Sequence, residues 1–171
     1  MIKPLFAKRP SIKIALILLV HIVIFSVYVM PKLAGEVEID PIDLQFAYTP
    51  ERAYDLIESY SDETREQYVI GEMTKDVAYP MIYTLFMSIT LMLLYPKNWK
   101  LAWLPYVLFA ADMLENIGII TLLLNYPSQL LMIAWVTSAF STIKWILVVI
   151  VISFIVFGLI KNVLNKIGKR N

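Results

Sequence analysis

The residues of this chain best suited to chemistry are two carboxylates, an amide and an ammonium that interrupt apolar stretches. Asp112, Glu115 and Asn116 stand at i, i+3 and i+4, so in a helix they share one face. Two carboxylates this close in a low dielectric should not both be ionised unless a cation compensates. Lys144 lies in a separate apolar stretch and can supply that charge. We therefore expect a carboxylate–ammonium pair between two neighbouring helices, because this arrangement leaves no isolated buried charge.

A second polar stripe, with Asp76, Pro80 and Tyr83 at i, i+4 and i+7, comes earlier in the chain. Pro80 has no N–H to donate to the carbonyl of residue 76, so that carbonyl is left free and the helix tends to kink. A free carbonyl beside a carboxylate suits a cation or a polar ligand. Alternatively, Asp76 follows Lys75 at the edge of an apolar stretch and is simply hydrated. Three hydroxyl residues can extend the polar lining: Ser138, Ser141 and Thr142.

These residues define a candidate polar cluster with two competing interpretations. Its members are His21, Asp76, Tyr83, Asp112, Glu115, Asn116 and Lys144. His21 is the least certain member, because it lies midway along the first apolar stretch and faces either lipid or the shared interior. In the structural interpretation, the ion pair and the amide fix the pairing of helices. In the functional interpretation, an outward-opening cavity binds a small polar molecule or lipid headgroup, and Asp112 or Glu115 accepts or donates a proton. We favour this second interpretation, because ionisable groups at membrane depth usually serve a function.

Four apolar segments carry or flank the residues of this cluster, in a chain that is 59% hydrophobic. Each is long enough, or nearly so, to cross ~30 Å of hydrocarbon as a helix of ~17–25 residues. They cover about 14–30, 77–95, 101–124 and 129–160. We predict an all-α, polytopic membrane protein in which residues 1–171 form one membrane domain, a four-transmembrane-helix bundle.

Three of these segments carry a further expectation. The first is 17 residues long and is followed by Lys32-Leu33-Ala34, a poor cleavage site, so we expect it to be retained rather than removed as a signal peptide. The helix of the second is expected to start earlier, near Asp62. The fourth would measure roughly 48 Å as a straight helix and must tilt, kink or project from the membrane.

The distribution of charge predicts the orientation. The N-terminal arm, the loop at 96–100 and the tail after residue 160 carry ten basic residues and no acid, whereas the segment from Lys32 to Lys75 has eleven acids against four basic residues. Because positive charge is retained in the cytoplasm, we expect a multi-pass protein of the cell membrane with both termini cytoplasmic and the 31–76 loop outside.

The outer loop is expected to contain a short amphipathic helical cap. Thr49-Pro50-Glu51 combines a hydroxyl N-cap, proline at the first helical position and an acid in the first turn. One semi-apolar face follows at helical spacing, with Ala53, Tyr54, Ile57 and Tyr60. We favour a helix resting on lipid headgroups with its tyrosines at the interface. The alternative is a lid that closes the outer mouth of the bundle.

Composition excludes several classes of site. The chain has no cysteine and a single histidine, which removes disulfides, thiolate chemistry, bis-histidine haem and histidine-rich zinc sites. It lacks a nucleophile elbow, a phosphate-binding glycine loop and a paired-histidine metal motif. The run from Asp112 to Asn116 resembles an acid-rich metal site, but three oxygen ligands without a phosphate are too few for Mg²⁺. We expect no metal and no other cofactor.

Three functional classes remain open. We favour a binding, sensory or assembly component. The alternatives are a membrane-embedded enzyme that uses a carboxyl as acid or base on a lipid or other apolar substrate, and an oligomeric proton- or cation-coupled transporter. The expected partners are the lipid bilayer, a lipid or small polar ligand within the bundle and further copies of the chain. No nucleic acid partner is expected.

Overall fold

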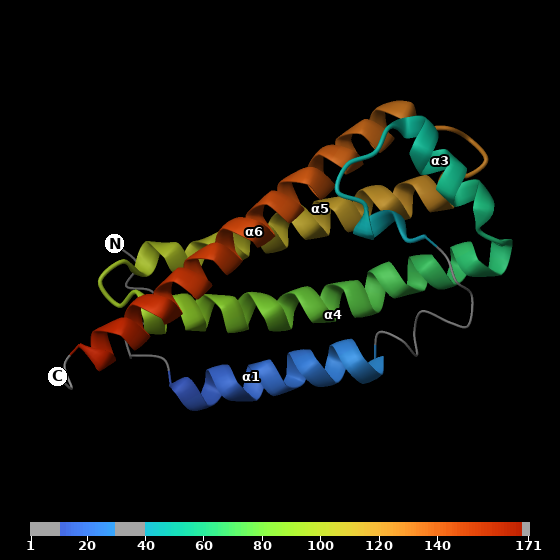
Figure 1. Ribbon diagram of the computed structural model, residues 1–171. Helices are drawn as coiled ribbons and strands as arrows, with labels where there is room; N and C mark the ends of the chain where they lie inside the picture. The colour runs from blue at the N-terminus through green and yellow to red at the C-terminus, as the bar shows by residue number, and fades with distance from the viewer. Residues whose placement is uncertain (1–10, 30–39, 169–171) are drawn as a thin grey trace, which may run out of the picture.

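The computed structural model describes residues 11–29 and 40–168, and all regular structure in those residues is helical (Figure 1). The elements in chain order are α1 (Ile12–Ile24), the π turn η1 (Phe25–Val29), the 3₁₀ turn η2 (Ile42–Leu44), α3 (Pro50–Ser59), α4 (Asp62–Leu94), the 3₁₀ turn η3 (Trp99–Trp103), α5 (Leu104–Asn125) and α6 (Leu131–Ile167). The predicted all-α class is confirmed. Three parts of the chain lie outside the described residues: the arm before Ser11, residues 30–39 and the last three residues. The predictions about the Lys32-Leu33-Ala34 sequence and about most of the basic N-terminal arm concern these parts.

Four helical segments of the described residues are long and apolar enough to cross a membrane. They are Ile12–Val29, Asp62–Leu94, Trp99–Asn125 and Leu131–Asn165. The early start of the second helix is confirmed, because α4 begins at Asp62 with the hydroxyl of Ser61 as its cap. The fourth helix continues to Ile167, beyond the predicted end at residue 160. It crosses α4 and α5 obliquely, so its length follows the diagonal of the bundle (Figure 1).

The central helix is α5, which packs against both α4 and α6, whereas α1 packs against α4 and is largely exposed. α1 begins and α6 ends at one end of the molecule, and α3 lies at the other, which we call the cap end (Figure 1). Two contacts of α4 hold the last turn of the first segment in place. The ring of Phe25 stacks on that of Tyr79 with 5.3 Å between centroids, and Ser26 Oγ lies 3.1 Å from Tyr79 Oη.

A glycine allows α5 and α6 to approach closely. A Cβ built on Gly118 would lie 2.1 Å from Oγ1 of Thr137 and 2.9 Å from its Cβ, distances that real side chains do not adopt. Glycine at this position therefore lets the two backbones meet, as small residues do where membrane helices cross. Glu115 lies three residues before Gly118 and Lys144 seven after Thr137, so each is on the contact face of its helix. The crossing sets the separation of these two charged residues.

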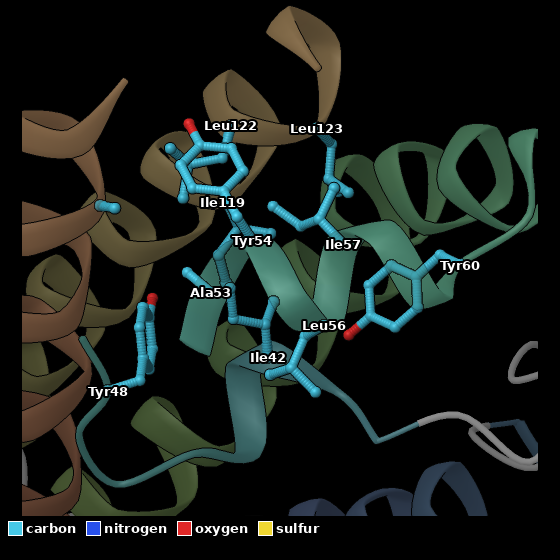
Figure 2. Close-up of a cluster of buried hydrophobic side chains, with 11 residues drawn as sticks. Ile42, Tyr48, Ala53, Tyr54, Leu56, Ile57, Tyr60, Ile119, Leu122 and Leu123 are labelled. Carbon is cyan, nitrogen blue, oxygen red and sulfur yellow. The ribbon is translucent and has the colours of Figure 1, made fainter. Parts of the chain in front are cut away.

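The helix predicted after Thr49 is present as α3, but its apolar face covers the end of the bundle (Figure 2). Tyr54 and Tyr60 are buried, and they pack in one cluster with Ile119 and Leu122 of α5. Our preferred interpretation, a helix lying on lipid headgroups with exposed tyrosines, was therefore wrong. The last turns of α5 present apolar side chains to the apolar face of α3, and packing these two surfaces together removes both from water.

Buried tyrosines of the cap act as hydrogen-bonding groups. The hydroxyl of Tyr60 donates to the carbonyl of Asp40 at 2.7 Å, and that of Tyr54 accepts from the backbone N–H of Leu130 at 2.5 Å. Burial raises the pKa of the Tyr60 hydroxyl, and the carboxylates of Asp43 and Asp40 raise it further. Tyr60 thus remains a proton donor at all ordinary pH values and fixes the cap to the segment before it.

Candidate functional site

The ion pair predicted between the third and fourth spans is present. Lys144 Nζ of α6 lies 2.6 Å from Glu115 Oε2 and 3.7 Å from Asp112 Oδ1, both on α5. Little of these side chains is exposed: 11% of Lys144, 11% of Asp112 and none of Glu115. Because one ammonium lies between two carboxylates, none of the three groups is an isolated charge in an apolar interior.

Asp112 is also held from the opposite side, by α4. The hydroxyl of Tyr83 donates to Asp112 Oδ2 at 2.5 Å. The ring of Tyr79 meets that of Tyr83 edge to face, with centroids 5.7 Å apart, which limits the orientations of Tyr83. Asp112 therefore joins three helices, because its two oxygens face Tyr83 of α4 and Lys144 of α6.

The backbone carbonyl freed by Pro80 has a partner within the protein. Asn116 Nδ2 donates to the carbonyl of Asp76 at 2.8 Å, replacing the helical bond that proline cannot make. The carboxyl of Asp76 is 17% exposed and lies 3.8 Å from Lys75 Nζ, so it is mostly buried rather than fully hydrated. The amide of Asn116 is thus committed to holding α4 against α5.

Two acidic residues of the site were missed by the sequence reasoning. The backbone carbonyl of Asp43, beside α6, accepts from Lys144 Nζ at 2.8 Å, and the carboxyl of Asp43 accepts from the hydroxyl of Tyr68. Glu72 is 1% exposed, and neither of its carboxyl oxygens has a hydrogen-bond partner among the described residues. Glu72 stands four residues before Asp76, so the helical stripe of Asp76 and Tyr83 could have been extended to it.

The hydroxyl residues of α6 bind the backbone that follows Asp43 rather than extend the lining of the polar cluster, and Ser138 and Thr142 line a separate hollow beside Ala47 and Tyr48. Ser138 Oγ accepts from the backbone N–H of Tyr48 at 2.9 Å, and Ser141 Oγ donates to the carbonyl of Gln45 at 2.5 Å. Thr142 Oγ1 lies 2.9 Å from the carbonyl of Ser138 on its own helix and 3.1 Å from the carbonyl of Phe46, and its one O–H is shared between these two acceptors. The backbone after η2 is therefore fixed along α6.

His21 is separate from the other members of the predicted cluster. It is exposed on α1, and its Nδ1 lies 2.7 Å from the carbonyl of Ile17 on the same helix. This local contact gives Nδ1 a partner on α1 itself, without help from α4 or α5. Of the two orientations considered, the structure has the outward one.

A pocket of about 350 Å³ lies between α1, η2, α4, α5 and α6. This volume falls within the range of ligand sites in proteins, roughly 300–1,000 Å³. The polar groups that line it are Asp43, Asp76, Tyr83, Asp112, Asn116 and Lys144. Apolar side chains form the rest of the lining, among them Leu19, Ile22, Phe86, Met87, Leu108 and Val148.

The pocket changes from polar to apolar along the axis of the bundle. On α4, which leads away from the cap end, the polar Asp76 and Tyr83 precede Met87. On α5, which runs the opposite way, Leu108 comes before Asp112. On α6 the polar Lys144 precedes Val148, four residues farther from the cap. All three helices therefore give the pocket a polar end toward the cap and an apolar end away from it.

The chemistry available at the polar end is that of carboxylates, one ammonium and a phenol. Within the described residues, no group of three or more His, Asp or Glu side chains is arranged to hold a metal ion. No protein-family model, curated protein or solved structure matches this chain. Its function is therefore inferred from the pocket and the residues that line it.

Proposed function

We propose that this chain is a multi-pass membrane protein that binds an amphiphile, a lipid-like molecule with a polar head and an apolar tail. The observation that supports this proposal is the graded pocket between α1, α4, α5 and α6. The head lies among Asp76, Asp112 and Lys144, and the tail extends past Leu108 and Val148. A purely structural cluster would need no such cavity, because cores normally close over paired charges.

The mouth of the pocket supports entry from the acyl chain region of a bilayer. Leu19 and Leu44 both line the pocket and are also 40% and 59% exposed, so the cavity reaches the surface between α1 and η2. In a membrane, this part of α1 faces fatty acyl chains. An amphiphile can therefore enter sideways without leaving the apolar phase.

In the orientation that we propose, the cap end is outside and the tail of the chain is cytoplasmic. The described part of the acidic loop lies at the cap end. The connection from α4 to η3, which includes Lys97 and Lys100, and the end of α6, which includes Lys161, are at the opposite end (Figure 1). Basic residues near the ends of spans favour the cytoplasmic side. The polar end of the pocket then lies in the outer half of the membrane.

The proposal is tested by filling the pocket. Val148→Phe places a larger side chain in the apolar end, and Val149→Phe, a control, adds the same ring at the next residue, which is 63% exposed and does not line the pocket. Native mass spectrometry of protein purified in mild detergent should show a retained amphiphile in the wild type and in Val149→Phe, and its loss in Val148→Phe. Equal retention by all three proteins would refute binding in this pocket, and so would a wild type that retains nothing.

A second candidate, a membrane-embedded enzyme, is supported by the direct access of Asp112 to the pocket. Its carboxyl accepts from Tyr83 and lies 3.7 Å from Lys144 Nζ, an arrangement suited to moving a proton on a bound molecule. Incubation with membrane lipid extract would then give a product whose mass changes with wild-type protein and not with Asp112→Asn. Identical lipid profiles for both proteins would exclude catalysis by Asp112 and leave binding as the only proposed function.

A further inference from the structure

The ammonium of Lys144 already has acceptors of the protein around it. Its ammonium has three N–H bonds. It lies 2.6 Å from Glu115 Oε2, donates at 2.8 Å to the carbonyl of Asp43 and lies 3.7 Å from Asp112 Oδ1. An anionic head entering the pocket would therefore have to compete with two carboxylates and a carbonyl for this cation.

Acidic residues, in contrast, outnumber basic ones at the polar end. Three acidic residues line the pocket, Asp43, Asp76 and Asp112, and Lys144 is the one basic residue among the described lining residues. Adding Glu115 and Lys75, which pair with lining groups, gives four carboxyls against two ammonium groups.

Two buried carboxyls next to the lining residues, but outside the lining itself, also have acceptor atoms without a partner. Glu115 Oε1 and both oxygens of Glu72 lack a hydrogen-bond partner among the described residues, although these side chains are 0% and 1% exposed. An unpaired buried acceptor is costly. This surplus of acidic groups, three of which belong to lining residues, favours a ligand that brings donors and positive charge.

Aromatic rings flank the same end of the pocket. Tyr79, Tyr83 and Trp145 line it there, and Phe86 follows toward the apolar end. Lys144 Nζ already lies 5.3 Å from the centroid of Trp145, within the range of a cation–π contact. Rings beside carboxylates form the kind of surface that stabilises an organic ammonium ion.

We propose that the amphiphile bound in the pocket carries a positively charged nitrogen, as an alkylammonium head. This inference rests on the proposed function, and it names the class of ligand. The ammonium lies among Asp76, Asp112 and the aromatic rings, and the alkyl tail extends toward Leu108 and Val148.

The test uses the full chain in neutral maltoside micelles, with Trp145 as a reporter. The chain has four tryptophans, and Trp99→Phe, Trp103→Phe and Trp135→Phe remove the exposed three. Three probes share one bromine-bearing alkyl chain, which quenches indole fluorescence on contact, and differ in their heads: primary ammonium, alcohol and sulfonate. We expect saturable quenching by the ammonium at a concentration at least tenfold below the alcohol, and the weakest binding by the sulfonate.

Carboxylate variants give an independent reading. Asp76→Asn should weaken ammonium binding about tenfold and leave alcohol binding unchanged, because one attractive charge is removed. Asp55→Asn neutralises an exposed acid of α3 and is the matched control. Sulfonate or alcohol binding as tight as that of the ammonium, or equal ammonium affinity in Asp76→Asn and wild type, would overturn the charge assignment alone. Absence of saturable quenching by every probe would instead overturn binding in the pocket itself.

Discussion

Replacing Lys144 by Met removes the ammonium at the centre of the cluster while keeping most of the side-chain volume. Glu115, which is completely buried, then loses the Nζ atom 2.6 Å from its Oε2. At an effective dielectric constant of about 20, the attraction across that distance is on the order of 6 kcal/mol. Desolvation of both ions offsets part of it, so we expect Lys144→Met to destabilise the folded protein by about 3–5 kcal/mol.

The assay is reversible unfolding of the detergent-solubilised protein, compared across a double-mutant cycle. Glu115→Gln in the Lys144→Met background neutralises the stranded acid, so the double variant should be more stable than Lys144→Met alone. Lys161→Met, at an exposed position farther along α6, is the control for loss of a positive charge. Equal stability of Lys144→Met and wild type would refute the pairing, and so would strictly additive effects of the two substitutions.

Three further predictions concern the helix crossing, the proline and the orientation. Gly118→Ala, whose Cβ would lie 2.1 Å from Thr137 Oγ1, should cost about 1–3 kcal/mol in the same unfolding assay, and Thr137→Ala should recover part of it. Gly71→Ala meets only the flexible end of Lys75 and should be tolerated, so equal costs at the two glycines would contradict the close crossing. Asn116→Leu should cost about 1–3 kcal/mol of folding stability, because it leaves the Asp76 carbonyl without a donor. Pro80→Ala should restore stability in that background, because alanine supplies the missing N–H. A double variant no more stable than Asn116→Leu would contradict the proposed role of Asn116 as the donor to this carbonyl. Because the chain has no cysteine, the single variants Glu58→Cys and Asn162→Cys can report the orientation in the membrane. A membrane-impermeant maleimide should label Glu58→Cys in intact cells and Asn162→Cys only after lysis. The reverse pattern would show that the proposed topology is inverted.

The contact between α5 and α6 was predictable because it depends on helical spacing and charge. Asp112 and Glu115 share a face wherever the segment is helical, and Lys144 is the one cation within the last apolar stretch. The starts of α3 and α4 were predictable for the same local reason, since the hydroxyls of Thr49 and Ser61 cap the turns that follow them.

The remainder of the site depends on how distant segments pack together in the tertiary structure, which the spacing of nearby residues does not predict. Asp43 meets Lys144 through its backbone carbonyl, and every residue type has this group, so no spacing in the sequence marks it. Glu72 was grouped with the hydrated acids of the loop, although α4 carries it into the interior. Tyr54 and Tyr60 are buried because the last turns of α5 present an apolar surface to α3, and an amphipathic pattern alone cannot distinguish such a surface from lipid.

The order of the charged residues along the chain has a consequence for biogenesis. Lys144 binds the carbonyl of Asp43, which was synthesised 101 residues earlier, and it also neutralises the acids of the preceding helix. Until the last helix enters the bilayer, α5 carries two carboxyls without their ammonium, and the segment after η2 has no hydroxyls to bind. The nascent protein therefore reaches its final form only when the ribosome has delivered α6, and a chain truncated before this helix should be a substrate for membrane quality control.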